Sequence, residues 1–151
     1  MSAQRDLTLA ARSELPVLIS ARSGRVRSEY ARAIHETSER GGDPLITIRC
    51  DGGNGHAREA TDQMREQLAA ACHGSVFLDR VDTLTPSGQG ELFSLIERLS
   101  RRRAPRGGDR LPAVRLISGS RHSLLRLVAA GRFREDLFYR LNAIHLIDPG
   151  Q

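Results

Sequence analysis

The sequence predicts an α/β protein in which a parallel β-sheet is covered by helices on both faces. Short apolar runs that end at a small or acidic residue alternate with longer segments of helical period, the pattern of strand–helix–strand units. The run at residues 74–81 stays apolar up to Asp79, as a central parallel strand does when helices cover both its faces. With 151 residues, 39% hydrophobic and no Trp, the chain suits one domain with a core of Leu, Ile, Val and Ala.

The expected elements alternate along the chain. Apolar runs mark strands at residues 15–20, 45–49, 74–81, 113–119 and 143–147. Helical periodicity marks helices at residues 2–12, 26–37, 57–72, 86–101 and 124–130, with a further amphipathic segment at 133–141. Loop signals separate them, such as the Gly-Gly-Asp-Pro run at 41–44. Because crossovers between parallel strands are right-handed, this order predicts a doubly wound sheet.

The basic charge of the chain is carried by arginine alone. All 23 basic residues are arginine, and the formal net charge is +5. The densest run, Arg101, Arg102 and Arg103, lies beside Pro and Gly residues and contains no aromatic residue or recognition-helix pattern. We interpret it as a solvated loop, and a nucleic-acid contact through these arginines is the alternative.

Several classes of site are not indicated by the sequence. Cys50 and Cys72 lack the spacing of a metal site or a disulfide framework, and the five histidines show no ligand spacing. No signal peptide and no apolar run of membrane-spanning length is present, so we expect a cytoplasmic protein without membrane contact.

The most distinctive segment is GRFREDLFYRLN, at residues 131–142. Taken alone it is an amphipathic helix, with Phe133, Leu137, Phe138 and Leu141 at helical spacing. Together with the phrases PVLIS, ARAIH and GSVFLD, however, it resembles the signature of the sigma-54 interaction domain, the AAA+ ATPase module of bacterial enhancer-binding transcription activators. The resemblance runs from Leu15 to Ile147.

This resemblance implies a three-layer AAA+ P-loop NTPase-like core with a five-stranded parallel sheet of order 5-1-4-3-2. Residues 1–14 would form an N-terminal helix of that core and residues 15–151 the α/β domain. Nothing between residues 52 and 71 reads as the family's GAFTGA motif, and no helical lid follows residue 147. We therefore expect a short form that makes no direct sigma-54 contact through a GAFTGA loop.

The phosphate-binding loop that the resemblance implies is altered. The family's loop reads approximately GESGTGKE, because glycines let backbone N–H groups approach phosphate and the lysine reaches the β and γ oxygens. Here the sequence from Ala21 reads ARSGRVRS, so the implied cofactor-binding positions are Ser23, Gly24, Arg25, Val26, Arg27 and Ser28. Arg27 replaces the lysine, and its planar fork does not reproduce a compact ammonium. The Cβ of Val26 would be strained if that position required a positive φ.

Two further positions of the implied nucleotide site are altered. The acidic pair that ends the third strand, for Mg²⁺ and for activation of water, is replaced by Asp79 and Arg80, and Arg121 stands where the family has a sensor asparagine. Asp79 remains a candidate for the Mg²⁺ shell or, alternatively, a plain strand cap. Asp82 is an alternative source of the missing carboxylate.

The resemblance also implies that Arg134 and Arg140 are trans-acting arginine fingers, which reach the nucleotide of a neighbouring subunit. Ordinary salt bridges from these arginines to Glu135 and Asp136 are the alternative.

We predict a sigma-54-interaction-type module with a degenerate nucleotide site that regulates transcription through protein–protein contacts, without useful ATP hydrolysis. One alternative is a weakly hydrolysing ATPase that binds ATP or ADP with Mg²⁺. Another is an arginine-loop nucleic-acid-binding module. Expected partners are another AAA+ subunit or a transcription regulator, with a homo-oligomer as a further option.

Overall fold

A computed structural model describes residues 2–51, 66, 74–101 and 114–148. The five strands are β1 (Val17–Ser20), β2 (Leu45–Arg49), β3 (Ser75–Asp79), β4 (Arg115–Ser120) and β5 (Ile144–Ile147). They form one sheet of order β2-β3-β4-β1-β5, and each neighbouring pair is parallel. Read from the other edge, this is the order 5-1-4-3-2, so the predicted topology is confirmed.

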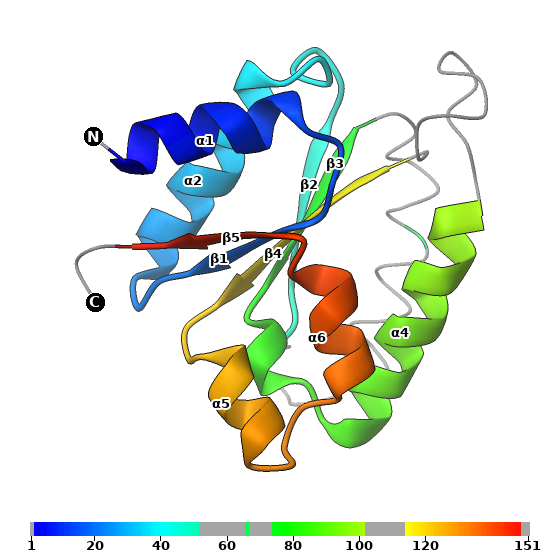
Figure 1. Ribbon diagram of the computed structural model, residues 1–151. Helices are drawn as coiled ribbons and strands as arrows, with labels where there is room; N and C mark the ends of the chain where they lie inside the picture. The colour runs from blue at the N-terminus through cyan, green and yellow to red at the C-terminus, as the bar shows by residue number, and fades with distance from the viewer. Residues whose placement is uncertain (1, 52–65, 67–73, 102–113, 149–151) are drawn as a thin grey trace.

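Helices cover both faces of the sheet (Figure 1). They are α1 (Ser2–Arg12), α2 (Gly24–Thr37), α4 (Pro86–Arg101), α5 (Leu124–Ala129) and α6 (Glu135–Leu141), with a short 3-10 helix η1 (Val81–Thr83). Side chains alternate along each strand, so that Val17 and Ile19 pack with α1 and α2, whereas Leu18 packs with the α4 and α6 side. No helix in the described part of the chain is long and apolar enough to cross a membrane.

The structure corrects the limits of several expected elements, among them β1, which begins at Val17, and β4, which runs from Arg115 to Ser120. The predicted strand 74–81 ends at Asp79, because Arg80 takes a left-handed conformation with φ 63° and η1 follows. The helix expected from Val26 begins at Gly24, where Ser23 caps it. In the signature segment Phe133 precedes α6, although it is buried as expected. The helix expected at 57–72 lies outside the described residues, apart from Glu66.

Buried polar side chains fasten the amino-terminal edge of the sheet. Arg115, the first residue of β4, is fully buried and donates hydrogen bonds to the carbonyl oxygens of Ala10 and Leu15. Burial lowers the pKa of this guanidinium. His35 Nε2 lies 2.7 Å from the carbonyl oxygen of Asp43 and His35 Nδ1 2.9 Å from the hydroxyl oxygen of Ser75. Because a carbonyl only accepts, His35 Nε2 donates to Asp43.

Candidate functional site

Three loops meet at the carboxyl edge of the sheet. They follow β1, β3 and β4, and these strands are neighbours in the order β3-β4-β1. In a parallel sheet the strand ends of neighbours lie at one edge, where open α/β folds place their sites. The backbone N–H of Ala21 donates to the carbonyl oxygen of Ser120, at 3.1 Å, which joins the loop after β1 to the end of β4.

The loop after β1 leads directly into α2. Ser23 is the N-cap residue, and its hydroxyl oxygen accepts a hydrogen bond of 3.3 Å from the backbone N–H of Val26. Gly24, Arg25 and Val26 form the first turn of the helix, with Arg27 following. In the described part of the chain Arg80 is the non-glycine residue with a positive φ, so Val26 does not carry the backbone strain considered above.

Arg27 turns back from α2 into the centre of the site. Its Nε donates to Asp79 Oδ1 at 2.7 Å, and its Nη2 lies 3.4 Å from Asp79 Oδ2. Its Nη1 donates to the carbonyl oxygens of Ala21, at 2.6 Å, and Arg22, at 3.1 Å. Arg27 is 4% exposed and Asp79 6%, so this is a buried ion pair. Asp79 therefore does more than cap the end of its strand.

Two glycines make room for this ion pair. A Cβ on Gly119, in β4, would lie 2.6 Å from Asp79 Oδ1 and 2.9 Å from the Phe77 ring. A Cβ on Gly24 would lie 3.2 Å from Arg27 Nη2. Sequence reasoning missed Gly119, whose only signal is a glycine one residue before the end of an apolar strand.

A second ion pair lies beside the first. Arg80 Nε and Nη2 lie 3.2 and 3.3 Å from the two carboxylate oxygens of Asp82. The Asp82 side chain is 1% exposed, and its Oδ1 also lies 3.4 Å from the backbone N–H of Arg121. The backbone N–H of Arg80 in turn donates to Asp79 Oδ1, at 3.0 Å. Asp82 is thus bound by Arg80, the residue that the family resemblance matches to a catalytic carboxylate.

Both carboxylates of this site are engaged within the chain. Mg²⁺ needs carboxylate oxygens that face it with their charge available. Here each of the two carboxylates, Asp79 and Asp82, faces a guanidinium of the same chain. Among the described residues, no group of three or more His, Cys, Asp or Glu side chains is placed to hold a metal ion.

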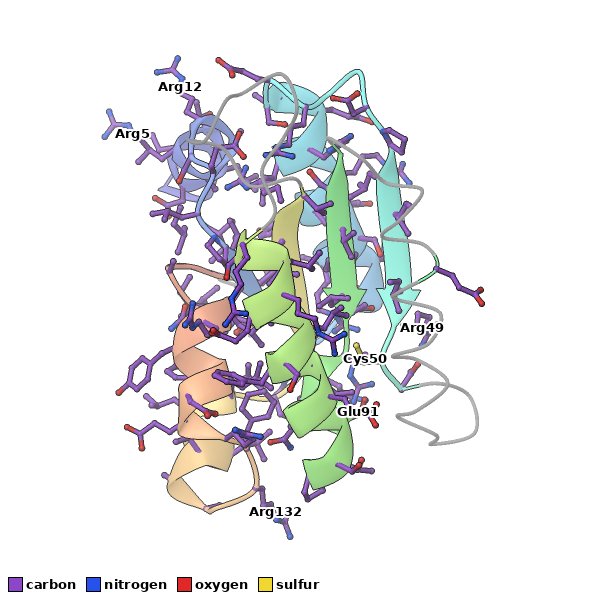
Figure 2. The ribbon with its side chains drawn as sticks, turned by 90° about the vertical axis from the view of Figure 1, so that its right-hand side faces the viewer. Arg5, Arg12, Arg49, Cys50, Glu91 and Arg132 are labelled. Atoms are coloured by element: carbon purple, nitrogen blue, oxygen red, sulfur yellow. The ribbon has the colours of Figure 1, made fainter. Side chains whose placement is uncertain are left out.

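Cys50 borders the site at the end of β2, where Figure 2 shows it beside Arg49. Its backbone N–H donates to the carbonyl oxygen of Asp79 at 2.8 Å. Burial raises the pKa of its thiol to about 12, and the nearby carboxylates of Asp79, Asp51 and Asp82 add to the shift. The thiol is therefore neutral at neutral pH, where it is a poor nucleophile.

Arg134, the N-cap residue of α6, forms a bidentate ion pair within its own chain. Its Nε and Nη2 donate to Asp136 at 3.0 and 2.8 Å, and its guanidinium lies 5.0 Å from the centre of the Phe93 ring. This hydrogen bonding raises the pKa of Arg134 and lowers the pKa of Asp136. Its side chain is 42% exposed, so the predicted salt bridge exists with Asp136 and the guanidinium still reaches solvent.

Arg140 lies at the other end of α6 and pairs with Glu97 of α4, not with Glu135 or Asp136. It also borders an apolar cavity of about 500 Å³ between α4, α6 and the sheet, with Leu92 and Leu95 among its walls. The structure places Arg134 and Arg140 on α6 and Arg27 and Asp79 on the loops of the carboxyl edge, and no hydrogen bond or ion pair between these two sets is found in the described part of the chain.

The predicted arginine loop falls mostly outside the described residues. Arg101 is the exposed last residue of α4, whereas Arg102 and Arg103 are not described. Other arginines are exposed to solvent. Figure 2 shows Arg5 and Arg12 on α1, and Arg132 after α5, projecting away from the body of the protein. Arg27, by contrast, is buried at the carboxyl edge of the sheet.

Comparison with known sequences places this chain in a family. The family model described as the sigma-54 interaction domain matches residues 52–147. The transcriptional regulatory protein ZraR of Escherichia coli K12 is 35% identical over 159 aligned residues, which cover 95% of this chain and 36% of ZraR. The Nif-specific regulatory protein of Azorhizobium caulinodans is 33% identical, over 93% of this chain and 25% of that protein. The chain thus spans about a third or less of these relatives.

Solved structures agree with this relationship. NtrX from Brucella abortus in complex with ADP has a TM-score of 0.77 and 26% identity over 97% of this chain and 35% of NtrX. The P-loop NTPase domain of a sigma-54 transport activator from E. coli has a TM-score of 0.67 over 90% of this chain and 98% of that domain; at 20% identity it shows the fold alone. Since the family model matches more than half of the residues, the chain belongs to the sigma-54 interaction domain family and has its AAA+ P-loop NTPase fold.

Proposed function

We propose that this chain is a sigma-54-interaction-type AAA+ module with a degenerate nucleotide site, which acts in transcription regulation through protein–protein contacts and does not hydrolyse ATP at a useful rate. The observation that supports this most directly is the buried Arg27–Asp79 ion pair. It engages, within the chain, the cation that would meet phosphate and the carboxylate that would meet Mg²⁺.

The environment of Arg80 supports the same proposal. A catalytic base must accept a proton from the attacking water, and a guanidinium cannot do this at any physiological pH. Asp82, the alternative carboxylate, is bound bidentately by Arg80 and also faces the N–H of Arg121. A weakly hydrolysing ATPase would have to break these contacts before Asp82 reached a water molecule.

NtrX, which has the same fold, was crystallised with ADP and with ATP. Nucleotide binding is therefore the first property to test in this chain. Calorimetry with ATP and ADP, with and without Mg²⁺, and a phosphate-release assay give the first test. We expect neither Mg²⁺-dependent binding nor turnover by the natural chain. Turnover that disappears in Asp79→Ala would contradict the proposal.

A gain-of-function variant sharpens this test. Arg27→Lys, Arg80→Glu and Arg121→Asn together restore the side chains that the family pattern asks for at the three altered positions. We expect the triple variant to bind Mg²⁺–ATP more tightly than the natural chain. The same replacements at Arg5, Arg12 and Arg132, which are exposed, form the matched control and should leave nucleotide binding unchanged.

The partially exposed arginines of α6 support a role toward a partner subunit. Arg134 and Arg140 keep about half of their side-chain surface open, at 42% and 47%. An arginine supplied in trans can accelerate phosphoryl transfer by roughly 10³ to 10⁵. Mixed with an ATP-hydrolysing member of the family, the chain should change the turnover of that partner, and Arg134→Ala or Arg140→Ala should remove the effect. Unchanged turnover at all mixing ratios would count against this role.

A further inference from the structure

The interior of the loop after β1 presents acceptors to a cation. Four oxygens point at the Arg27 guanidinium: the two of the Asp79 carboxylate and the carbonyls of Ala21 and Arg22. Three of these four contacts are 3.1 Å or shorter, and both charged partners are buried. Charge-assisted hydrogen bonds of this kind are stronger than neutral ones, and they strengthen further away from water.

The contacts continue through the neighbouring loops without a gap. Asp79 Oδ1 accepts from the backbone N–H of Arg80, whose side chain holds Asp82, and Asp82 accepts from the backbone N–H of Arg121. The ends of β1, β3 and β4 are therefore joined by side chains as well as by the sheet. Gly119 lets Asp79 approach β4 closely.

We propose that Arg27 is a built-in occupant of this site: its guanidinium fills a cation site formed by Asp79, Ala21 and Arg22, and so holds the three loops in one closed arrangement without a nucleotide. Turnover would require Mg²⁺–ATP to displace Arg27 from Asp79, so the proposal rests on the function proposed above. Its consequence is that the loop arrangement, and any partner surface built on it, does not respond to ATP.

Chemical rescue tests the site directly. Arg27→Ala removes the guanidinium and leaves Asp79 buried without its counter-ion, so we expect the Tm to fall by roughly 10 °C. Free guanidinium ion at tens of millimolar should refill the site and restore a large part of this loss, whereas sodium chloride at equal ionic strength should not. Arg25→Ala, whose arginine lies two residues away and is 87% exposed in its side chain, is the matched control and should show neither the loss nor the rescue.

Two results would overturn the proposal here. One is an Arg27→Ala protein that melts at the temperature of the natural chain. The other is a variant whose Tm responds equally to guanidinium and sodium chloride, because a filled cation site must discriminate between them.

If Arg27→Ala does not fold, NMR of the natural chain tests the same proposal. The Nε–H of Arg27 is buried and bonded to Asp79, so its NMR signal should exchange slowly with water. The signal is assigned by its loss in Arg27→Lys. It should not move on addition of millimolar Mg²⁺–ATP.

The two proposals fail in different ways in this experiment. If Mg²⁺–ATP displaces the Arg27 signal without any phosphate release, Arg27 is not a permanent occupant, yet the absence of hydrolysis stands. If phosphate is released in an Asp79-dependent manner, the proposed function itself falls. A fast-exchanging Nε–H in the nucleotide-free protein would overturn the occupant alone.

Discussion

Arg27 and Asp79 form the contact on which the properties of the site depend, and a double-mutant cycle measures it. Removing one partner of a buried pair leaves an uncompensated charge, which costs about 3–5 kcal/mol. For Asp79→Asn, Arg27→Met and the double variant, we expect urea unfolding to give a coupling free energy of about 2 kcal/mol or more.

The exposed pair Arg25–Glu29, with the same two charge types at 2.9 Å, is the control for this cycle. Pairs of this kind on a helix surface are worth about 0.3–0.5 kcal/mol, because water screens them. If the coupling free energy of Arg27 and Asp79 is no larger than that of Arg25 and Glu29, burial adds nothing to this contact.

Cys50 should make the free energy of unfolding depend on pH in the alkaline range. Its pKa is raised from 9.0 to about 12 in the folded chain. The unfolded state therefore loses the thiol proton first, and the free energy of unfolding should fall as the pH rises from about 9 toward 12, by at most about 1.4 kcal/mol per pH unit. Chemical unfolding at several pH values checks this. In Cys50→Ala this part of the slope should vanish, and an unchanged slope would refute the assignment.

At the scale of the elements, the close approach of β4 to β3 predicts a position that accepts no side chain. Gly119→Ala would bring a Cβ to 2.6 Å from Asp79 Oδ1, so we expect a loss of roughly 1–3 kcal/mol in the free energy of unfolding. Gly42→Ala, with nothing within 4 Å of its Cβ, is the matched control and should change stability by no more than about 0.5 kcal/mol. Equal effects would show that β4 has room to shift.

Helix α6 owes its stability to one face. Leu137 is fully buried in the core, whereas Tyr139, two residues on, is 67% exposed. Leu137→Ala should therefore cost about 2–5 kcal/mol, through lost burial and the cavity left behind. Tyr139→Ala should cost far less, and urea denaturation of both variants separates the two cases. A Tyr139 effect as large as that of Leu137 would point to packing of the tyrosine that the exposed fraction does not indicate.

At the scale of the whole molecule, β5 is fastened to β1 by a contact that depends on pH. His145 Nε2 lies 2.7 Å from Ser20 Oγ, and burial lowers the pKa of this histidine below its usual 6.5. The unfolded state binds the proton first, so stability should fall as the pH drops below about 6.5. His145→Gln should flatten this limb, measured by unfolding from pH 7 downward. His122→Gln, also at an exposed position but without the contact to Ser20, is the control and should not flatten it. A limb that survives in His145→Gln would assign it to other groups.

The strands and helices could be predicted because each is encoded by the residue pattern of its own short segment. The apolar runs and helical periods predicted each of the described strands and helices except η1, and the family resemblance supplied the order of the sheet. Gly131, the first residue of the signature segment, is one example. Its φ of 73° after α5 is a conformation that favours glycine, so the residue type and the local structure agree. The errors lay at element ends such as Arg80, where a contact with Asp82 competes with the strand.

The sequence by itself determined the α/β class and the family, because apolar period and residue identity are properties of short segments. It also predicted three altered positions in the implied nucleotide site. Only the tertiary structure decided where the altered side chains point. Arg27 and Asp79 are separated by 52 positions, and Arg140 and Glu97 lie on different helices. Nor does the sequence show that Nε and Nη1 of buried Arg115 have no hydrogen-bond partner among the described residues. Which charged side chains pair depends on distance and burial in the folded chain. Because every basic residue is arginine, the sequence offers each carboxylate many partners of equal charge.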